Sequence, residues 1–299
     1  MKIFNLKNIL IILVGSFYAI ISLEFIPQYS RDFYNIARSI DFTSKNLNID
    51  LLWVLYHIKG NTILLMPFDL LSIFNGYQSA YFIYFTAILL RFVAAFRYLN
   101  FKTAIAFIFA FFWMFDWNQS RFSIAFSLFL LLPPKRQLLQ LFIHFGLLIR
   151  LAYEKIKYVK RFFILTPIVG FFTVAFLKIF FNRYFLPSND NFPKYSIVYI
   201  LFFILITLIN KNKNVTIKKE EITFGFCTLI LFLIFIQAGL SWTYFGRASE
   251  IILLISIANY IKNFKNQSLD RNIIFRVCLY TIGLYQLITV NGNVWRLFN

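Results

Sequence analysis

The stretch DWNQSRFSIAFSLFLLLPPKRQLLQLFIHFGLLIR, residues 116–150, sets ionisable groups beside and inside long apolar runs. Arg121 begins one apolar segment, a basic turn at 133–136 follows it, and His144 lies within the next segment. Ionisable groups are costly at hydrocarbon depth, and where they occur they commonly mark a functional site. The stretch therefore predicts membrane helices that hold a polar site among them.

The composition of the whole chain agrees with this reading. Of its 299 residues, 60% are hydrophobic, 41 are Phe and only 14% are charged, and the mean hydropathy is +0.70. A water-soluble domain of this composition cannot cover its surface with polar groups. The apolar runs are continuous rather than alternating, unlike those of a transmembrane β-barrel. We therefore expect an all-α polytopic integral membrane protein with a single domain, 1–299.

The net charge of +18 does not indicate a nucleic-acid partner. The basic residues form short clusters between apolar runs, as the positive-inside rule requires, and some of them are expected to meet anionic membrane lipid. Cys227 and Cys278 lie in apolar segments without metal or redox spacing, so we interpret both as small core residues.

Nine apolar runs approach the length of about 17 to 25 residues that a membrane span needs. Lys2 and Lys7 precede the first run and no small-residue cleavage site follows it, which predicts a retained span rather than a signal peptide. The runs cover approximately residues 9–26, 78–97, 101–117, 119–134, 162–181, 195–210, 222–240, 246–262 and 272–290.

Two further segments, 51–75 and 137–152, are interrupted or short. If neither makes a net crossing, every basic turn falls on the cytoplasmic side. We therefore expect about nine to eleven transmembrane helices, with broken or re-entrant elements in these two segments, which would line a cavity. The polar loop 27–50 is then external, and Asp116, Arg121 and Arg247 lie near the same external face.

Two arginines begin outward-facing helices. A guanidinium binds phosphate in bidentate fashion, and a helix N-terminus also favours anions, so Arg121 and Arg247 together suit a diphosphate. Each has a structural alternative: Arg121 reaching lipid headgroups or pairing with Asp116, and Arg247 pairing with Glu250 at i, i+3.

Two other groups are candidates for proton transfer. His144 is placed for proton transfer or a hydrogen bond to a polar substrate, against the alternative of a neutral histidine bonded across helices. Asp32, beside Arg31 and Tyr34 in the external loop, is a candidate for a general base or for binding sugar hydroxyls, against the alternative of a solvated loop. No metal centre is expected, because His57 is the only other histidine and no carboxylate cluster accompanies either one.

Three ordered stretches resemble the EpsG-like group of bacterial polysaccharide polymerases, which includes the Wzy-type O-antigen polymerases. RDFYNIA at 31–37 is similar to the early Asp-aromatic motif of the family, QSRFSIAFSLFLL at 119–131 to its Arg-containing helix start, and IHFGLLI at 143–149 to its Ile-His-aromatic segment. The arginine at 247 also matches. Phe122 departs from the pattern, because the family usually has Gln there.

The resemblance implies a metal-independent glycosyltransferase without a cofactor, in the bacterial inner membrane. It would polymerise repeat units linked to undecaprenyl pyrophosphate into O-antigen or a related surface polysaccharide at the periplasmic face, with a chain-length regulator protein as a further partner. Arg121 and Arg247 would stabilise the leaving diphosphate, and Asp32 or His144 would be the base. The expected substrate-binding residues are Arg31, Tyr34, Asp116, Gln119, Arg121 and Arg247.

Two other classes compete with this reading. A flippase or transporter of lipid-linked sugars also needs a cationic cavity, but it favours internal repeats that the chain does not display. An O-antigen ligase-like transferase has similar cations but usually a larger external loop than 27–50.

Overall fold

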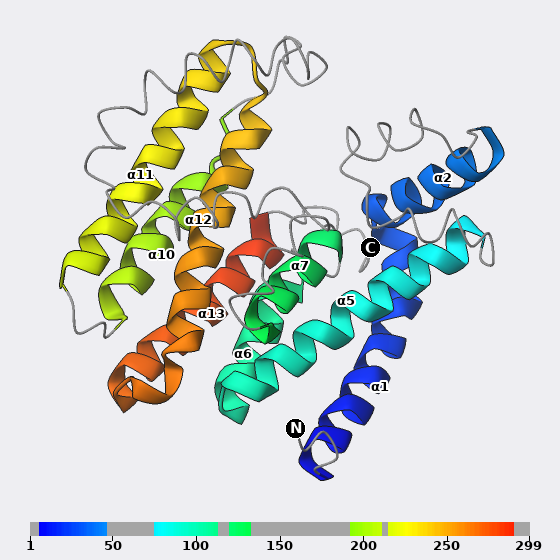
Figure 1. Cartoon of the computed structure of the whole chain (residues 1–299), viewed down its shortest axis with the longest axis horizontal. Coiled ribbons are helices and arrows are strands. Elements are labelled where there is room, and N and C mark those ends of the chain that lie inside the picture. Colours follow the sequence, from blue (N-terminus) through cyan, green and yellow to red (C-terminus); the bar gives the residue numbers. More distant parts are fainter. Residues whose placement is uncertain (1–5, 47–74, 113–119, 133–191, 211–214, 290–299) are drawn as a thin grey trace. The chain divides into compact units, whose positions relative to one another are not determined.

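A computed structural model of the chain describes residues 6–46, 75–112, 120–132, 192–210 and 215–289 (Figure 1). Within these ranges the chain forms α-helices and one short 3-10 helix but no strand, which confirms the all-α class. The helices are α1 (Leu6–Tyr29), α2 (Arg31–Asn46), α5 (Gly76–Tyr98), α6 (Phe101–Phe111), α7 (Ser120–Leu131), α10 (Tyr195–Ile209), α11 (Val215–Gln237), α12 (Trp242–Lys262), η6 (Phe264–Asn266) and α13 (Leu269–Thr289).

Most of the predicted apolar runs coincide with helices. A helix lies at each of eight expected runs, but α6 and α7 are only 11 and 12 residues long. The run 162–181 and both predicted broken elements, apart from Asn75, lie outside the described residues. The predicted polar loop 27–50 contains α2, and the side of the membrane on which it lies stays a prediction.

The chain divides into two compact units, Met1–Leu147 with Arg276–Asn299, and Leu148–Phe275. One of the two boundaries falls within α13. The prediction of a single domain over 1–299 stays a prediction.

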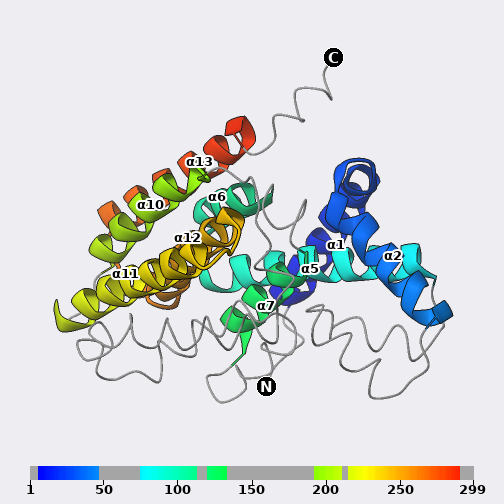
Figure 2. The same ribbon diagram turned by 90° about the horizontal axis from the view of Figure 1, so that it is seen from above.

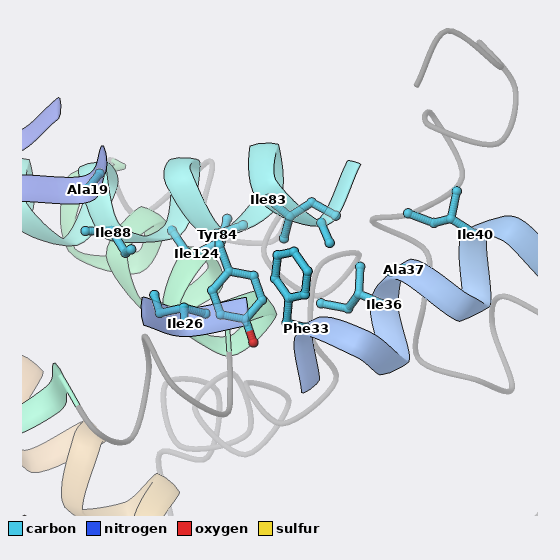
Figure 3. Packing of buried hydrophobic residues seen from close by; sticks show 12 residues of the cluster. Ala19, Ile26, Phe33, Ile36, Ala37, Ile40, Ile83, Tyr84, Ile88 and Ile124 are labelled. Atoms are coloured by element: carbon cyan, nitrogen blue, oxygen red, sulfur yellow. The ribbon is translucent and has the colours of Figure 1, made fainter. Parts of the chain in front are cut away.

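The core of the first unit gathers where α1, α2 and α5 meet. Ser30 separates α1 from α2, and its hydroxyl accepts a hydrogen bond from the amide of Phe33, three residues into α2, as a helix N-cap does. The same hydroxyl bonds to that of Tyr84 on α5 at 2.8 Å. Figure 3 shows the Phe33 ring beside Tyr84, among Ile26, Ile36 and Ile83. The turn between the first two helices is therefore attached to the third.

The N-terminus of α5 is fixed by two sets of hydrogen bonds. Asn75 and Gln78 form a capping box, in which each side chain accepts from the other residue's backbone amide. The carboxylate of Asp41, from α2, accepts a bond of 2.8 Å from the amide of Gly76. A side chain at Gly76 would meet the Ala37 carbonyl and the Asp41 carboxylate, so glycine permits this close approach of α2 to α5.

A buried arginine connects α5 to α6. Arg91 lies within α5 and only 1% of it is exposed. Its guanidinium donates a hydrogen bond of 3.0 Å to the carbonyl of Phe111, the last residue of α6. From α7, Phe126 packs on Phe107 and Phe111 with ring centroids 6.4 Å apart in both pairs. The short helices α6 and α7 thus pack beside a cation held inside the protein.

In the second unit, α12 packs against both α10 and α11 (Figures 1 and 2). Its residues from Gly246 to Ala258 are buried except Arg247, so its apolar surface faces protein. The Thr207 hydroxyl of α10 hydrogen bonds to that of Ser256 at 2.7 Å. Beyond the C-terminus of α10, the Asn210 amide oxygen accepts a bond of 2.9 Å from Gln267.

Two described helices are long and apolar enough to cross a membrane, Leu6–Glu24 of α1 and Gly76–Tyr98 of α5. Three shorter apolar helices accompany them, Phe101–Phe111, Tyr195–Ile209 and Glu221–Gln237. Both cysteines, Cys227 and Cys278, are free and buried, as expected of small core residues.

Candidate functional site

The N-terminal half of α12 is the best-described part of the predicted site. Ser241 caps the helix, because its hydroxyl accepts a hydrogen bond of 3.2 Å from the Thr243 amide. Arg247 follows in the second turn and is exposed. Its guanidinium carbon lies 6.0 Å from the centroid of the Tyr244 ring, within the range of a cation–π contact. One face of this helix start therefore presents a cation to its surroundings.

Aromatic side chains surround this helix start. The ring of Phe192, just before α10, lies 5.3 Å from that of Trp242 and 5.6 Å from that of Phe245, measured between centroids. Phe192 is 38% exposed and Trp242 is partly exposed. Exposed rings beside a cation suit a ligand that has both an apolar face and a negative charge.

A tyrosine of α10 lies against the same turns of α12. A Cβ at Gly246 would come within 2.7 Å of the Tyr195 ring, so the phenol occupies the space that a side chain at 246 would fill. The Ser249 hydroxyl donates a bond of 2.7 Å to the Gly246 carbonyl. The Tyr195 phenol also interacts electrostatically with Glu250 and Arg247. The Tyr195 phenol, the Glu250 carboxylate and the Arg247 guanidinium are therefore neighbours at this helix start.

Arg247 and Glu250 differ in exposure. A pair at i, i+3 on one helix would bring their side chains together, and this structural alternative for Arg247 stays a prediction. Arg247 is exposed, whereas Glu250 is 5% exposed. The guanidinium of Arg247 is thus directed outward, and the carboxylate of Glu250 lies within the protein.

A second aromatic group lies in the first unit, where α2 meets α5. The buried Phe33 ring contacts three partly exposed tyrosines, Tyr34, Tyr77 and Tyr81, with centroids 5.0 to 6.0 Å apart. Tyr34 is one of the predicted substrate-binding residues, and its ring also meets Tyr77 edge to face. This tyrosine group offers aromatic edges and hydroxyls at the N-terminal end of a candidate membrane span.

The remaining predicted residues are placed only in part. Arg31 and Asp32 lie in the first turn of α2, and Arg121 is the second residue of α7. Nothing is described of these three side chains. Asp116, Gln119 and His144 lie outside the described residues.

The predicted diphosphate site needs two arginines side by side. Arg121 belongs to the first unit and Arg247 to the second. Their proximity therefore stays a prediction.

Sequence reasoning missed the burial of Arg91 and of Glu250. Arg91 interrupts the apolar run 78–97, and an arginine inside such a run by itself indicates a buried polar contact or a functional role. The i, i+3 spacing indicates Glu250 only as a partner of Arg247. Its burial was not predictable, because α12 is apolar around most of its circumference and no periodicity marks one face as internal.

No group of three or more His, Cys, Asp or Glu within the described ranges is arranged to hold a metal ion. Compared with known proteins, the chain matches no family model, no curated protein and no solved structure. The likeness to EpsG-like polymerases therefore depends on the sequence motifs alone.

Proposed function

We propose that the chain is an integral membrane glycosyltransferase that polymerises repeat units linked to undecaprenyl pyrophosphate into a surface polysaccharide. It would act at the periplasmic face of the bacterial inner membrane and would cross that membrane about nine times. The observation that carries the proposal is the exposed Arg247 in the second turn of α12, among partly exposed aromatic rings.

The exposed apolar side chains of the helices support a membrane location. On α1, Leu10, Leu13 and Phe17 are 60%, 62% and 66% exposed. On α10, Leu201 and Leu208 are 61% and 53% exposed. Contiguous apolar surface of this kind is rare on soluble monomers, whereas lipid covers it at no cost.

Charge and chemistry support a lipid diphosphate as the ligand. The donor loses an undecaprenyl diphosphate, so negative charge develops on that leaving group as its bond to the sugar breaks. A fixed guanidinium stabilises such charge more in the transition state than in the ground state, which accelerates transfer. The rings of Phe192 and Trp242 would pack on the apolar face of a sugar.

The test compares Arg247→Ala with Lys265→Ala, which removes an exposed cation just beyond the other end of α12. Each variant is expressed in cells that lack the wild-type chain, and the length of the surface polysaccharide is read from a gel. Arg247→Ala should leave at most a single repeat unit at normal protein level. Lys265→Ala should give normal long chains.

Binding gives a second measurement on the purified full chain. Arg247→Ala should weaken the affinity for undecaprenyl diphosphate by about 10- to 150-fold, as expected for a lost charge-assisted hydrogen bond of ~1.5–3 kcal/mol. Normal chains and normal affinity in this variant would exclude Arg247 from the site.

Deletion of the chain separates the rival classes. Loss of a polymerase leaves single repeat units on the cell surface, because delivery and attachment continue. Loss of a flippase delivers no units, and loss of a ligase leaves long chains on the lipid carrier. Either of the last two results would replace the proposal.

A further inference from the structure

A buried carboxylate lies one turn from the exposed arginine of α12. Glu250 is 5% exposed, although its helix is otherwise apolar from Ile251 to Ile255. At ~1.5 Å per residue, it lies about 12 Å along the helix from Trp242. An acidic residue at such a place is costly, and it is commonly retained for function.

Helix geometry directs this carboxylate toward Tyr195. Residues at i and i+4 share a helix face, so Glu250 projects from the same face as Gly246. Helical side chains also lean toward the N-terminus, which brings the carboxylate back over the turn that contains Gly246. The Tyr195 phenol fills that space and interacts electrostatically with Glu250.

Arg247 lies beside the same face. Residues three apart on a helix have Cβ atoms ~5–6 Å from each other, so the two side chains start close together and then diverge. The exposed guanidinium and the buried carboxylate thus start from the same turn of α12. A ligand whose diphosphate meets Arg247 would have its sugar about one helical turn from Glu250.

We propose that Glu250 is the general base of the transferase, in place of Asp32 or His144, and that Tyr195 positions its carboxylate. This inference rests on the proposed function, because it assigns a role within the same reaction. It adds a catalytic residue that neither the motifs nor the resemblance indicated.

The hydroxyl oxygen of the acceptor sugar attacks the anomeric carbon of the donor glycan and forms the new glycosidic bond. The bond from that carbon to the diphosphate oxygen breaks, and its electron pair leaves with undecaprenyl diphosphate, which Arg247 stabilises. The acceptor's proton passes to the carboxylate of Glu250, which later releases it to water.

The directions of the two side chains suit this division of roles. The base must approach the acceptor on the side of the sugar opposite the leaving group. Arg247 is exposed and Glu250 is buried one turn away, so the two groups would address different sides of a bound sugar.

The test uses Glu250→Gln, which keeps the shape of the side chain but cannot accept the proton. The matched control is Glu221→Gln, which alters the other buried glutamate described in the same unit. Transfer is measured with purified full-length protein and the lipid-linked repeat units of the producing cell. Rates are referred to monodisperse protein, so a lower yield does not imitate a lower rate.

Glu250→Gln should reduce the transfer rate by about 10²- to 10⁴-fold, while its affinity for undecaprenyl diphosphate stays within about twofold of wild type. Glu250→Asp should recover part of the rate, because it restores a carboxylate. Tyr195→Phe should lower the rate by less than Glu250→Gln and leave donor affinity unchanged. Glu221→Gln should behave as wild type.

Three results would overturn the inference, and each differs from a failure of the proposed function. A normal rate in Glu250→Gln together with a lost rate in Arg247→Ala would exclude Glu250 as the base but retain the transferase. Weakened donor affinity in Glu250→Gln, or an equal loss in Glu221→Gln, would indicate a structural role. If wild-type protein transfers nothing, the proposed function itself is wrong.

Discussion

The guanidinium of Arg91 donates a hydrogen bond of 3.0 Å to the carbonyl of Phe111, and so connects the middle of α5 to the C-terminus of α6. The last carbonyls of a helix have no partner within the helix, and a cation favours that end of its dipole. With 11 residues, α6 is ~16 Å long, about half the hydrocarbon thickness of a bilayer. The arginine therefore contributes a cation and a hydrogen bond at the end of α6.

Replacing Arg91 with methionine should destabilise the protein. The variant keeps a long apolar side chain but removes the hydrogen bond from the guanidinium to the Phe111 carbonyl, at a cost of about 1–3 kcal/mol. Unfolding of the purified protein in mixed micelles measures this change. Arg97→Met, at an exposed position on the same helix, should stay within about 0.5 kcal/mol of wild type. Equal effects of the two variants would contradict the role given to Arg91.

Gly76→Ala should loosen the contact between α2 and α5. The added Cβ would meet the Ala37 carbonyl and come within 2.7 Å of the Asp41 carboxylate, so one helix must move, at a cost of about 1–3 kcal/mol. Ser79→Ala is the matched control on α5, since it removes a buried hydroxyl without a hydrogen-bond partner in the structure described. That control should be neutral or slightly stabilising. A neutral Gly76→Ala would show that α2 does not dock as described.

The hydroxyls of Thr207 and Ser256 should be energetically coupled. A double-mutant cycle with Thr207→Val and Ser256→Ala isolates the bond between α10 and α12. Interhelical bonds of this kind in membranes average about 0.6 kcal/mol and reach about 1.7 kcal/mol. Thr228 bonds to the Phe224 carbonyl of its own helix, so a cycle of Thr207→Val with Thr228→Val should be additive. Zero coupling in the first cycle would exclude the contact.

Cysteine labelling should place the two ends of α5 on opposite sides of the membrane. The helix has 23 residues, a length of about 34 Å, which is sufficient to span the hydrocarbon core. A cysteine at the exposed position Tyr77 should react with an impermeant maleimide in intact spheroplasts, as should one at Asn35 on α2. A cysteine at Lys102, beyond the other end, should react only after lysis. Labelling of all three from one side would exclude α5 as a span.

The sequence of α2 carries a helical signal within a polar segment. The polar composition of residues 27–50 predicts a loop. Phe33, Ile36, Ala37 and Ile40 nevertheless recur at the spacing of one helix face, and all four are buried. Averaging the composition of the segment hides this periodicity, whereas the spacing of the apolar residues shows it.

The sequence by itself determined where most helices lie. The lengths of the apolar runs predicted the bounds of α1, α5 and α10 closely. A capping pair such as Asn75 and Gln78 marks the start of a helix with residues only three positions apart. These features depend on residues within a few positions of one another, so no knowledge of packing is needed to read them.

Only the tertiary structure decided which side chains meet. Arg91 reaches a carbonyl 20 residues away, Ser30 a hydroxyl 54 residues away, and Tyr195 a turn of α12. When a helix is apolar on all sides, its sequence does not distinguish the face that meets protein from the face that meets lipid. Packing therefore decides that Glu250 is buried and Arg247 exposed, although the sequence places them one turn apart.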